Sequence, residues 1–124
     1  ERFNLETYQW EAIAPLPHAC GYMSLIRLKD HEAFYALGGY NKSNLTIVQH
    51  LELDSLTWSV LPIEFPFTHC RCILPSFKLD ESEVYFINRD KLYVFNPALS
   101  TVRIVKTFPT EIGDYGGPSI YINR

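Results

Sequence analysis

Two short segments of the sequence combine histidine with cysteine, the residue types that bind zinc or supply a reactive thiolate. His18 and Cys20 are separated by one alanine, and His69 directly precedes Cys70, with Cys72 two residues further on. On a strand, Cys70 and Cys72 would face the same side, because side chains alternate with a period of two. A structural zinc site needs four converging ligands and normally leaves two or more residues between paired cysteines. The sequence therefore predicts no metal and no cofactor, and we expect Cys70 and Cys72 to be reduced and buried.

Other patterns of catalytic chemistry are missing from the sequence. It contains no Gly-x-Ser-x-Gly elbow, no phosphate-binding glycine loop and no His-Glu-x-x-His. Its carboxylates follow no spacing that predicts a paired general acid and base. We therefore expect a protein that is not an enzyme.

The composition is that of one globular domain of 124 residues, with 47% apolar and 20% charged residues. This lies far from the composition of disordered chains. The net charge is −3 and the two signs are interspersed, so the sequence predicts neither nucleic-acid nor membrane binding. The first ten residues lack the basic start and apolar stretch of a signal peptide, and three cysteines, an odd number, fit a reducing compartment. We expect a cytoplasmic protein.

An internal repeat is the strongest organising signal. Phe3–Trp10, Leu51–Trp58 and Phe95–Val102 each begin with an apolar residue, continue through polar and small residues, and close with a large apolar one. Their first residues lie 48 and 44 residues apart. These intervals are near those of β-propeller blades and differ from the shorter helical repeats and the leucine-rich repeats.

Between these copies the chain consists of short aromatic and β-branched runs separated by charged turns, a pattern typical of strands. No window sustains the apolar spacing of a helix, and eight prolines with six glycines would interrupt one. Each period is therefore expected to hold four strands. They are 22–28, 33–40, 46–53 and 58–63 in the first period, then 70–77, 84–89, 91–97 and 102–108 in the second.

The segment FYALGGYNKSNLTIVQHLELDSLTW joins a glycine pair, Gly38 and Gly39, to Trp58. Glycine permits backbone conformations closed to other residues and close approach of a neighbouring chain, and tryptophan can fill the space between two packed sheets. The order of apolar strand, double glycine, acidic turn and tryptophan resembles a kelch repeat. The segment that ends at Trp10 resembles the end of such a repeat.

The resemblance implies an all-β fold of kelch-type β-propeller blades, each of four antiparallel strands, in a partial ring. Residues 1–15 would be the last strands of one blade, 21–63 a full blade, 70–108 a degenerate full blade and 116–124 the first strand of the next. In the degenerate blade, Asn88 and Arg89 replace the glycine pair and Val102 replaces the tryptophan. Propellers close with about four to eight blades. We therefore expect a part of a longer chain, or, as the alternative, assembly of several short chains.

Because neighbouring strands alternate in direction, the connections from second to third strand and the links between blades fall on one face, where loops are free to bind. The side chains expected there are of the types found at protein contact sites. They are Tyr40, Asn41, Lys42 and Asn44, then Asn88, Arg89 and Asp90, with His69 and Arg71 in a blade-linking segment. Arg71 is the strongest single candidate, because a guanidinium can bind a carboxylate through two parallel hydrogen bonds. An ion pair within the protein, or simply solvated turns, are the structural alternatives.

In kelch-like proteins the corresponding loops hold peptide or protein partners. The resemblance therefore implies a non-enzymatic protein-interaction scaffold, or adaptor, that binds a protein or peptide. A sugar-binding or catalytic propeller, similar to galactose oxidase or to sugar mutarotases, is the alternative, although nothing in the sequence singles out their catalytic residues.

Overall fold

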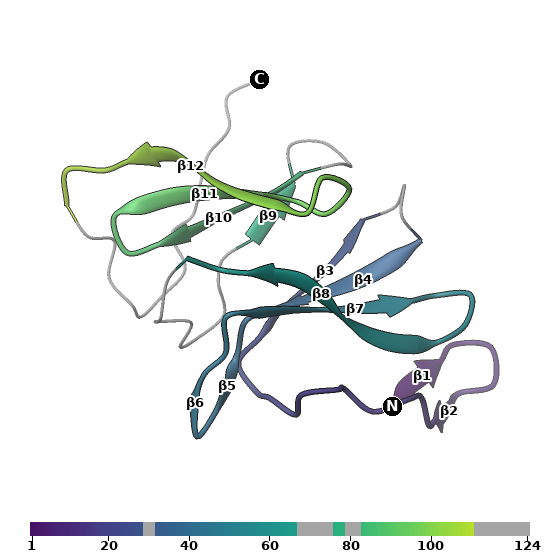
Figure 1. The fold of residues 1–124 in the computed structure, drawn as a ribbon. Helices are drawn as coiled ribbons and strands as arrows, with labels where there is room; N and C mark the ends of the chain where they lie inside the picture. The colour runs from purple at the N-terminus through teal and green to yellow at the C-terminus, as the bar shows by residue number, and fades with distance from the viewer. Residues whose placement is uncertain (29–31, 67–75, 79–82, 111–124) are drawn as a thin grey trace.

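The computed structural model describes residues 1–28, 32–66, 76–78 and 83–110, and within these ranges the chain forms strands and turns and no helix (Figure 1). The predicted all-β class is confirmed. The strands are β1 (Arg2–Asn4), β2 (Gln9–Glu11), β3 (Ser24–Leu28), β4 (Ala33–Leu37), β5 (Tyr40–Asn41), β6 (Ser43–Asn44), β7 (Ile47–Glu52), β8 (Thr57–Glu64), β9 (Ser76–Lys78), β10 (Val84–Asn88), β11 (Lys91–Asn96) and β12 (Thr101–Thr107).

Two four-stranded antiparallel sheets dominate the described residues. Their strand orders are β3-β4-β7-β8 and β9-β10-β11-β12, so that neighbours in each sheet follow one another along the chain, apart from the small β5–β6 hairpin inserted between β4 and β7. These eight strands are the ones that the sequence predicts. Residues 70–75 of the expected fifth strand lie outside the described residues. The predicted two-residue turn of the second sheet is also confirmed, since Asn88 pairs with Lys91 across Arg89 and Asp90.

The two four-stranded sheets pack face to face with one apolar core between them (Figure 1). The burial of β3 alternates strictly, with Ile26 and Leu28 buried and Leu25 exposed, as expected for a strand with one face on a core. Three aromatic contacts join the sheets and the end of β8: the ring centroids lie 5.2 Å apart for Phe65–Phe86, 6.4 Å for Phe65–Phe95 and 5.9 Å for Tyr35–Phe95. The core comprises Ile26, Leu28, Ala33, Tyr35, Leu37, Val48, Phe65, Val84, Phe86, Tyr93 and Phe95.

The three repeated segments form three hairpins with the same register. Their first and last residues are direct cross-strand partners: Phe3 pairs with Trp10, Leu51 with Trp58 and Phe95 with Val102. Each hairpin has a four-residue turn whose last residue has a positive φ, 55° at Tyr8, 51° at Leu56 and 50° at Ser100. In the first and third copies, Asn4 and Asn96 accept hydrogen bonds from turn amides through Oδ1, which is how asparagine stabilises turns. The predicted repeat of the hairpin is therefore confirmed.

The glycine pair ends β4 for the reason that its sequence predicts. Gly38 and Gly39 have φ values of 63° and 111°, and a side chain at Gly39 would place its Cβ 2.9 Å from the carbonyl oxygen of Gly21 and 3.1 Å from the sulfur of Cys20. Real Cβ atoms do not approach a backbone oxygen this closely. The pair thus allows the chain to leave the sheet and lets Cys20 and Gly21, in the link that leads into β3, pack against it.

Candidate functional site

The connections between strands gather at the two ends of the sheets (Figure 1). At one end, on the left in Figure 1, lie the β5–β6 hairpin, the β10–β11 turn and the ends of β8 and β12. We name this end the loop face and define it by residues 38–46, 64–66, 88–91 and 106–110. At the opposite end lie the β7–β8 and β11–β12 turns. The structure thus places both second-to-third-strand connections at the same end, as the sequence predicts.

Three of the predicted partner-binding residues lie on the β5–β6 hairpin. Tyr40 and Asn41 form β5, and Lys42 occupies the turn with a φ of 58°. Asn41 and Lys42 are exposed, whereas Tyr40 is half-buried and exchanges backbone hydrogen bonds of 2.9 and 3.1 Å with Gly21. The hairpin therefore presents Asn41 and Lys42 to solvent. Asn44, on β6, is half-buried.

The predicted residues of the second sheet differ in their exposure. Arg89 is exposed at the β10–β11 turn, with a φ of 53°. Asn88, directly before it, is only 8% exposed, so the turn brings Arg89 and not Asn88 to the surface. His69, Cys70, Arg71 and Cys72 lie outside the described residues, as does 116–124.

The two tryptophans occupy matching positions of the first and second hairpins but differ in their surroundings. Trp10 is 68% exposed and contacts Phe3, with ring centroids 5.2 Å apart. Trp58 is half-buried and lies opposite Leu51, whereas Gly38 donates its backbone N–H to the carbonyl of Ile47, four residues earlier on β7. Within this sheet, the tryptophan and the glycine pair therefore sit at different points along the strands.

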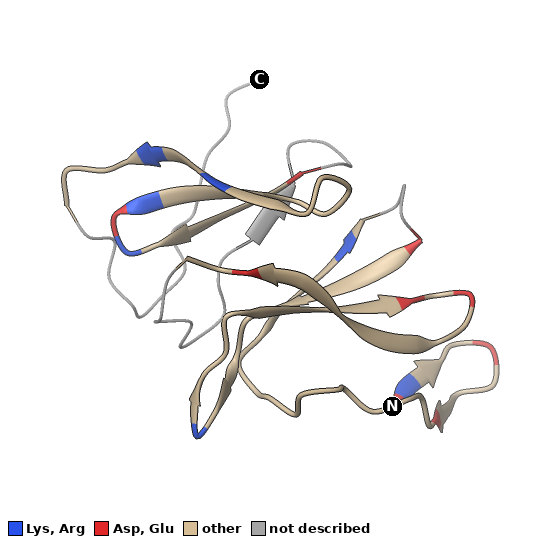
Figure 2. Cartoon of the chain, in the orientation of Figure 1, with Lys and Arg blue, Asp and Glu red and all other residues tan. Residues whose placement is uncertain are grey.

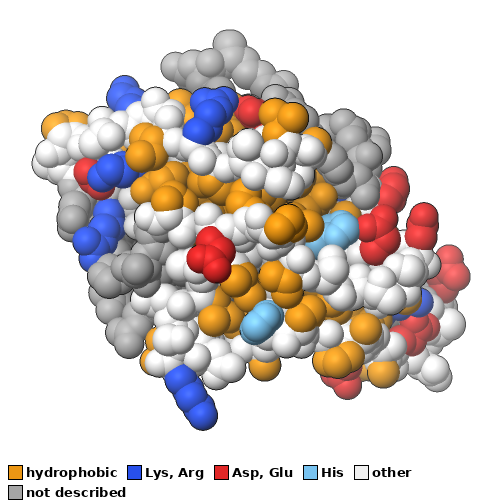
Figure 3. Space-filling model, in the orientation of Figure 1, with side chains coloured by type: hydrophobic (Ala, Val, Ile, Leu, Met, Phe, Trp, Pro, Cys, Tyr) orange, Lys and Arg blue, Asp and Glu red, His pale blue; other side chains and the backbone are white. Residues whose placement is uncertain are grey.

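The charges of the described residues separate toward the two ends of the sheets (Figures 2 and 3). The loop face carries four cations and two acids, namely Lys42, Arg89, Lys91, Lys106, Asp90 and Glu64. The Lys91 ammonium donates hydrogen bonds of 2.7 and 2.9 Å to the Asp90 carboxylate and holds the pKa of that carboxyl below its ordinary value.

The opposite end carries acids at the turns and strand ends, namely Glu32, Glu52, Asp54 and Glu83. Arg27 and Arg103 reach two of these acids, with Arg27 3.4 Å from Glu32 and Arg103 3.6 Å from Glu83. The loop face is thus the more basic of the two ends.

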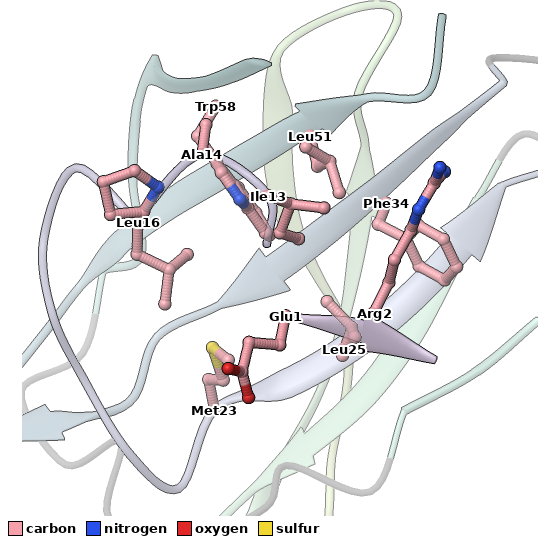
Figure 4. Close-up of a pocket in the computed structure, with 11 residues that line it drawn as sticks. Glu1, Arg2, Ile13, Ala14, Leu16, Met23, Leu25, Phe34, Leu51 and Trp58 are labelled. Carbon is pink, nitrogen blue, oxygen red and sulfur yellow. The ribbon is translucent and has the colours of Figure 1, made fainter. Parts of the chain in front are cut away.

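A groove on the outer face of the first sheet is a feature that the sequence reasoning missed (Figure 4). Its volume is about 570 Å³, and its walls come from the sheet, the β2–β3 link and the chain start. The lining residues are Glu1, Arg2, Ile13, Ala14, Pro15, Leu16, Met23, Leu25, Phe34, Leu51 and Trp58. A signal for it exists in the sequence, because the segment AFYAL has apolar residues at both alternating sets of positions. Strands of that kind are covered on both faces.

A buried amide fixes the β2–β3 link to the first sheet. Gln49 is fully buried; its Oε1 accepts a hydrogen bond of 2.8 Å from the backbone N–H of His18, and its Nε2 donates one of 3.0 Å to the carbonyl of the same residue. The Nε2 also lies 3.5 Å from the sulfur of Cys20, a free and half-buried thiol. Burial raises the pKa of Cys20, and the hydrogen bond from Gln49 opposes that shift only in part. The thiol is therefore held in its protonated, unreactive form.

Ser59, His50 and Glu52 lie side by side on β7 and β8. His50 Nδ1 is 3.4 Å from Ser59 Oγ, and His50 Nε2 is 3.3 Å from Glu52 Oε2. Both distances exceed the range of about 2.6 to 3.2 Å expected between a nucleophile, its base and the orienting acid. The ring of His50 also packs on Tyr35, with centroids 5.0 Å apart. The arrangement supports cross-strand packing better than catalysis.

No group of three or more His, Cys, Asp or Glu side chains that could hold a metal ion occurs in the described ranges. Nor does any helix there have the length and apolarity needed to cross a membrane.

Comparison with known proteins assigns no family to the chain, because no family model and no curated protein sequence matches it.

Proposed function

We propose that the chain forms blades of a kelch-type β-propeller and serves as a protein-interaction scaffold whose loop face binds a protein or peptide partner. The propeller is supported by two successive four-stranded meanders that pack face to face and by three hairpins of identical register. Propeller blades are four-stranded antiparallel sheets of this kind. The scaffold belongs to a longer chain or a larger complex in the cytoplasm, where a free thiol such as Cys20 is stable.

The observation that carries the binding function is the exposure of cationic side chains at rigid turns of the loop face. Lys42 and Arg89 both sit at turn residues with positive φ, at the tips of separate hairpins. Their turns are fixed by cross-strand pairs, Asn41 with Ser43 and Asn88 with Lys91. Because the backbone of each turn is already fixed, binding has to order only the two side chains. The basic surplus favours a partner with acidic residues.

The experiment that tests the proposal compares charge-removing variants at the two ends of the sheets. The double variant Lys42→Gln with Arg89→Gln removes two positive charges from the loop face, and Arg27→Gln with Arg103→Gln removes two from the opposite end. Partners captured by the parent protein are identified by mass spectrometry and their affinity is measured with purified components. We expect about a tenfold or greater loss for the loop-face variant, a strong dependence on salt, and little change for the control.

Equal affinity of both variants for every partner would contradict the proposal. Loss of binding to, or turnover of, a sugar with protein partners unaffected would instead favour the sugar-binding or catalytic propeller.

A further inference from the structure

The groove on the outer face of the first sheet is lined by residues whose equivalents in the second sheet pack against the first sheet. The shared hairpin register makes Leu51 and Trp58 of the first sheet equivalent to Phe95 and Val102 of the second. The next strand inward extends the equivalence, since Phe34 pairs with Leu51 and Val84 pairs with Phe95. The same three positions are therefore present on both sheets.

At these equivalent positions, the clearest difference in burial is at Phe34 and Val84. In the second sheet, Val84 and Phe95 are fully buried in the core against the first sheet, and Val102 packs against that core. In the first sheet, Leu51 is also buried and Trp58 is half-buried, as Val102 is, whereas Phe34 is half-buried at the position where Val84 is fully buried. Phe34, Leu51 and Trp58 all line the groove (Figure 4). Within the part of the chain that the structure describes, the outer face of the first sheet thus has the residues of a sheet-to-sheet interface but borders a groove and not a complete sheet.

The β1–β2 hairpin supplies part of what is missing. It has the register of β7–β8 and β11–β12, so β1 is equivalent to β7 and β11. β7 and β11 each pair on their inner edge with a further strand, β4 and β10 respectively, whereas among the described residues β1 pairs with β2 alone. A sheet edge of this kind readily accepts another strand.

We propose that the groove and the inner edge of β1 together form a docking site for two antiparallel strands with the apolar pattern of β3 and β4. The inner strand pairs with β1 and places an apolar residue opposite Phe3, as Phe34 lies opposite Leu51 and Val84 opposite Phe95. The two strands and the β1–β2 hairpin then form a third four-stranded sheet, which covers Phe34 and Trp58. Occupation of this site does not depend on what the loop face binds.

The repeat itself provides the probe. Because Phe3 is equivalent to Leu51, Glu1 is equivalent to Gln49. A second copy of residues 21–48, fused directly before Glu1, therefore supplies strands equivalent to β3 and β4 in the register of the repeat. A matched control carries residues 21–47, one residue fewer, which turns every apolar side chain of the joined strand to the wrong face. Both fusions are made on the full 124-residue chain with Trp10→Phe, so that Trp58 is the sole tryptophan.

We expect the in-register fusion to be monomeric by light scattering and to melt roughly 5 to 10 °C above the control fusion. Its Trp58 emission should shift to shorter wavelength and become less accessible to a soluble quencher, and the amides of β1 should gain protection from hydrogen exchange. Equal melting temperatures and equal Trp58 emission in the two fusions would overturn the proposal, whether or not the loop face binds a partner. So would a parent chain that is a dimer in solution and becomes a monomer with Leu25→Glu, because a second copy would then occupy the groove.

Discussion

Replacement of Phe95 by alanine tests whether the two four-stranded sheets share one core. Phe95 is fully buried, and its ring contacts Tyr35 of the first sheet and Phe65 at the end of β8. Burial of one such side chain is worth about 1.5 to 3 kcal/mol, and each aromatic pair adds about 0.5 to 1.5 kcal/mol. With the cavity that remains, we expect Phe95→Ala to lower the free energy of unfolding by about 3 to 5 kcal/mol.

The assay is urea and thermal unfolding followed by circular dichroism and by Trp58 fluorescence, with Trp10→Phe in every variant so that Trp58 is the sole tryptophan. For a domain of this size the loss corresponds to a decrease of roughly 10 to 20 °C in melting temperature. The matched control is Leu99→Ala in the β11–β12 turn, where the side chain is 70% exposed and where we expect a change within about 0.5 kcal/mol. If the two sheets share one core, the unfolding transitions followed by circular dichroism and by Trp58 fluorescence must shift together. A loss below about 1 kcal/mol, or a shift of the circular dichroism transition with Trp58 unfolding as in the parent, would refute it.

Three further results are expected from the first sheet. Gly39→Ala should destabilise the fold by more than about 1 kcal/mol in urea unfolding, because its φ is 111° and the new Cβ would lie 2.9 Å from the carbonyl oxygen of Gly21. Gln49→Ala should cost about 1 to 3 kcal/mol, since it removes both hydrogen bonds that fix the β2–β3 link; unchanged proteolysis of that link would contradict this. Burial raises the pKa of Cys20 and of Tyr35 in the folded state, so their contribution to stability is complete at neutral pH and is lost as pH rises. Urea midpoints measured between about pH 7 and about pH 11 should therefore fall with pH, and midpoints that hold steady or rise would contradict the sign.

The strands and their order could be predicted from the sequence because their signals are local. Runs such as VYFIN and KLYVFN contain β-branched and aromatic residues and are separated by a short polar turn, so the run and its partner are neighbours along the chain. The hairpins repeat their turn chemistry, with Asn4 and Asn96 at equivalent positions. The role of the glycine pair could also be predicted from the sequence, since few residues other than glycine tolerate a φ such as the 111° of Gly39.

The groove and the buried amide could not be predicted in the same way. A glutamine within an alternating strand normally indicates the solvent side, and only the approach of His18, 31 residues away in sequence, makes Gln49 a buried residue. The pattern of AFYAL indicates a strand with two apolar faces, but it does not show which distant segments line the groove over the outer face. The burial of Asn88 was missed for a similar reason, because a residue next to a turn is expected to be exposed.

The order of the strands along the chain also has a consequence for the way in which the protein folds. Every strand of the four-stranded sheets pairs with strands close to it in sequence, and the β7–β8, β10–β11 and β11–β12 hairpins close turns of only two or four residues. Short hairpins of this kind form within about 1 to 10 μs. The strand pairs of each sheet can therefore form from residues that have already left the ribosome, whereas the apolar core closes only when both sheets are present. Synthesis of the chain would then build the core one interface at a time, in the order in which the repeats are encoded.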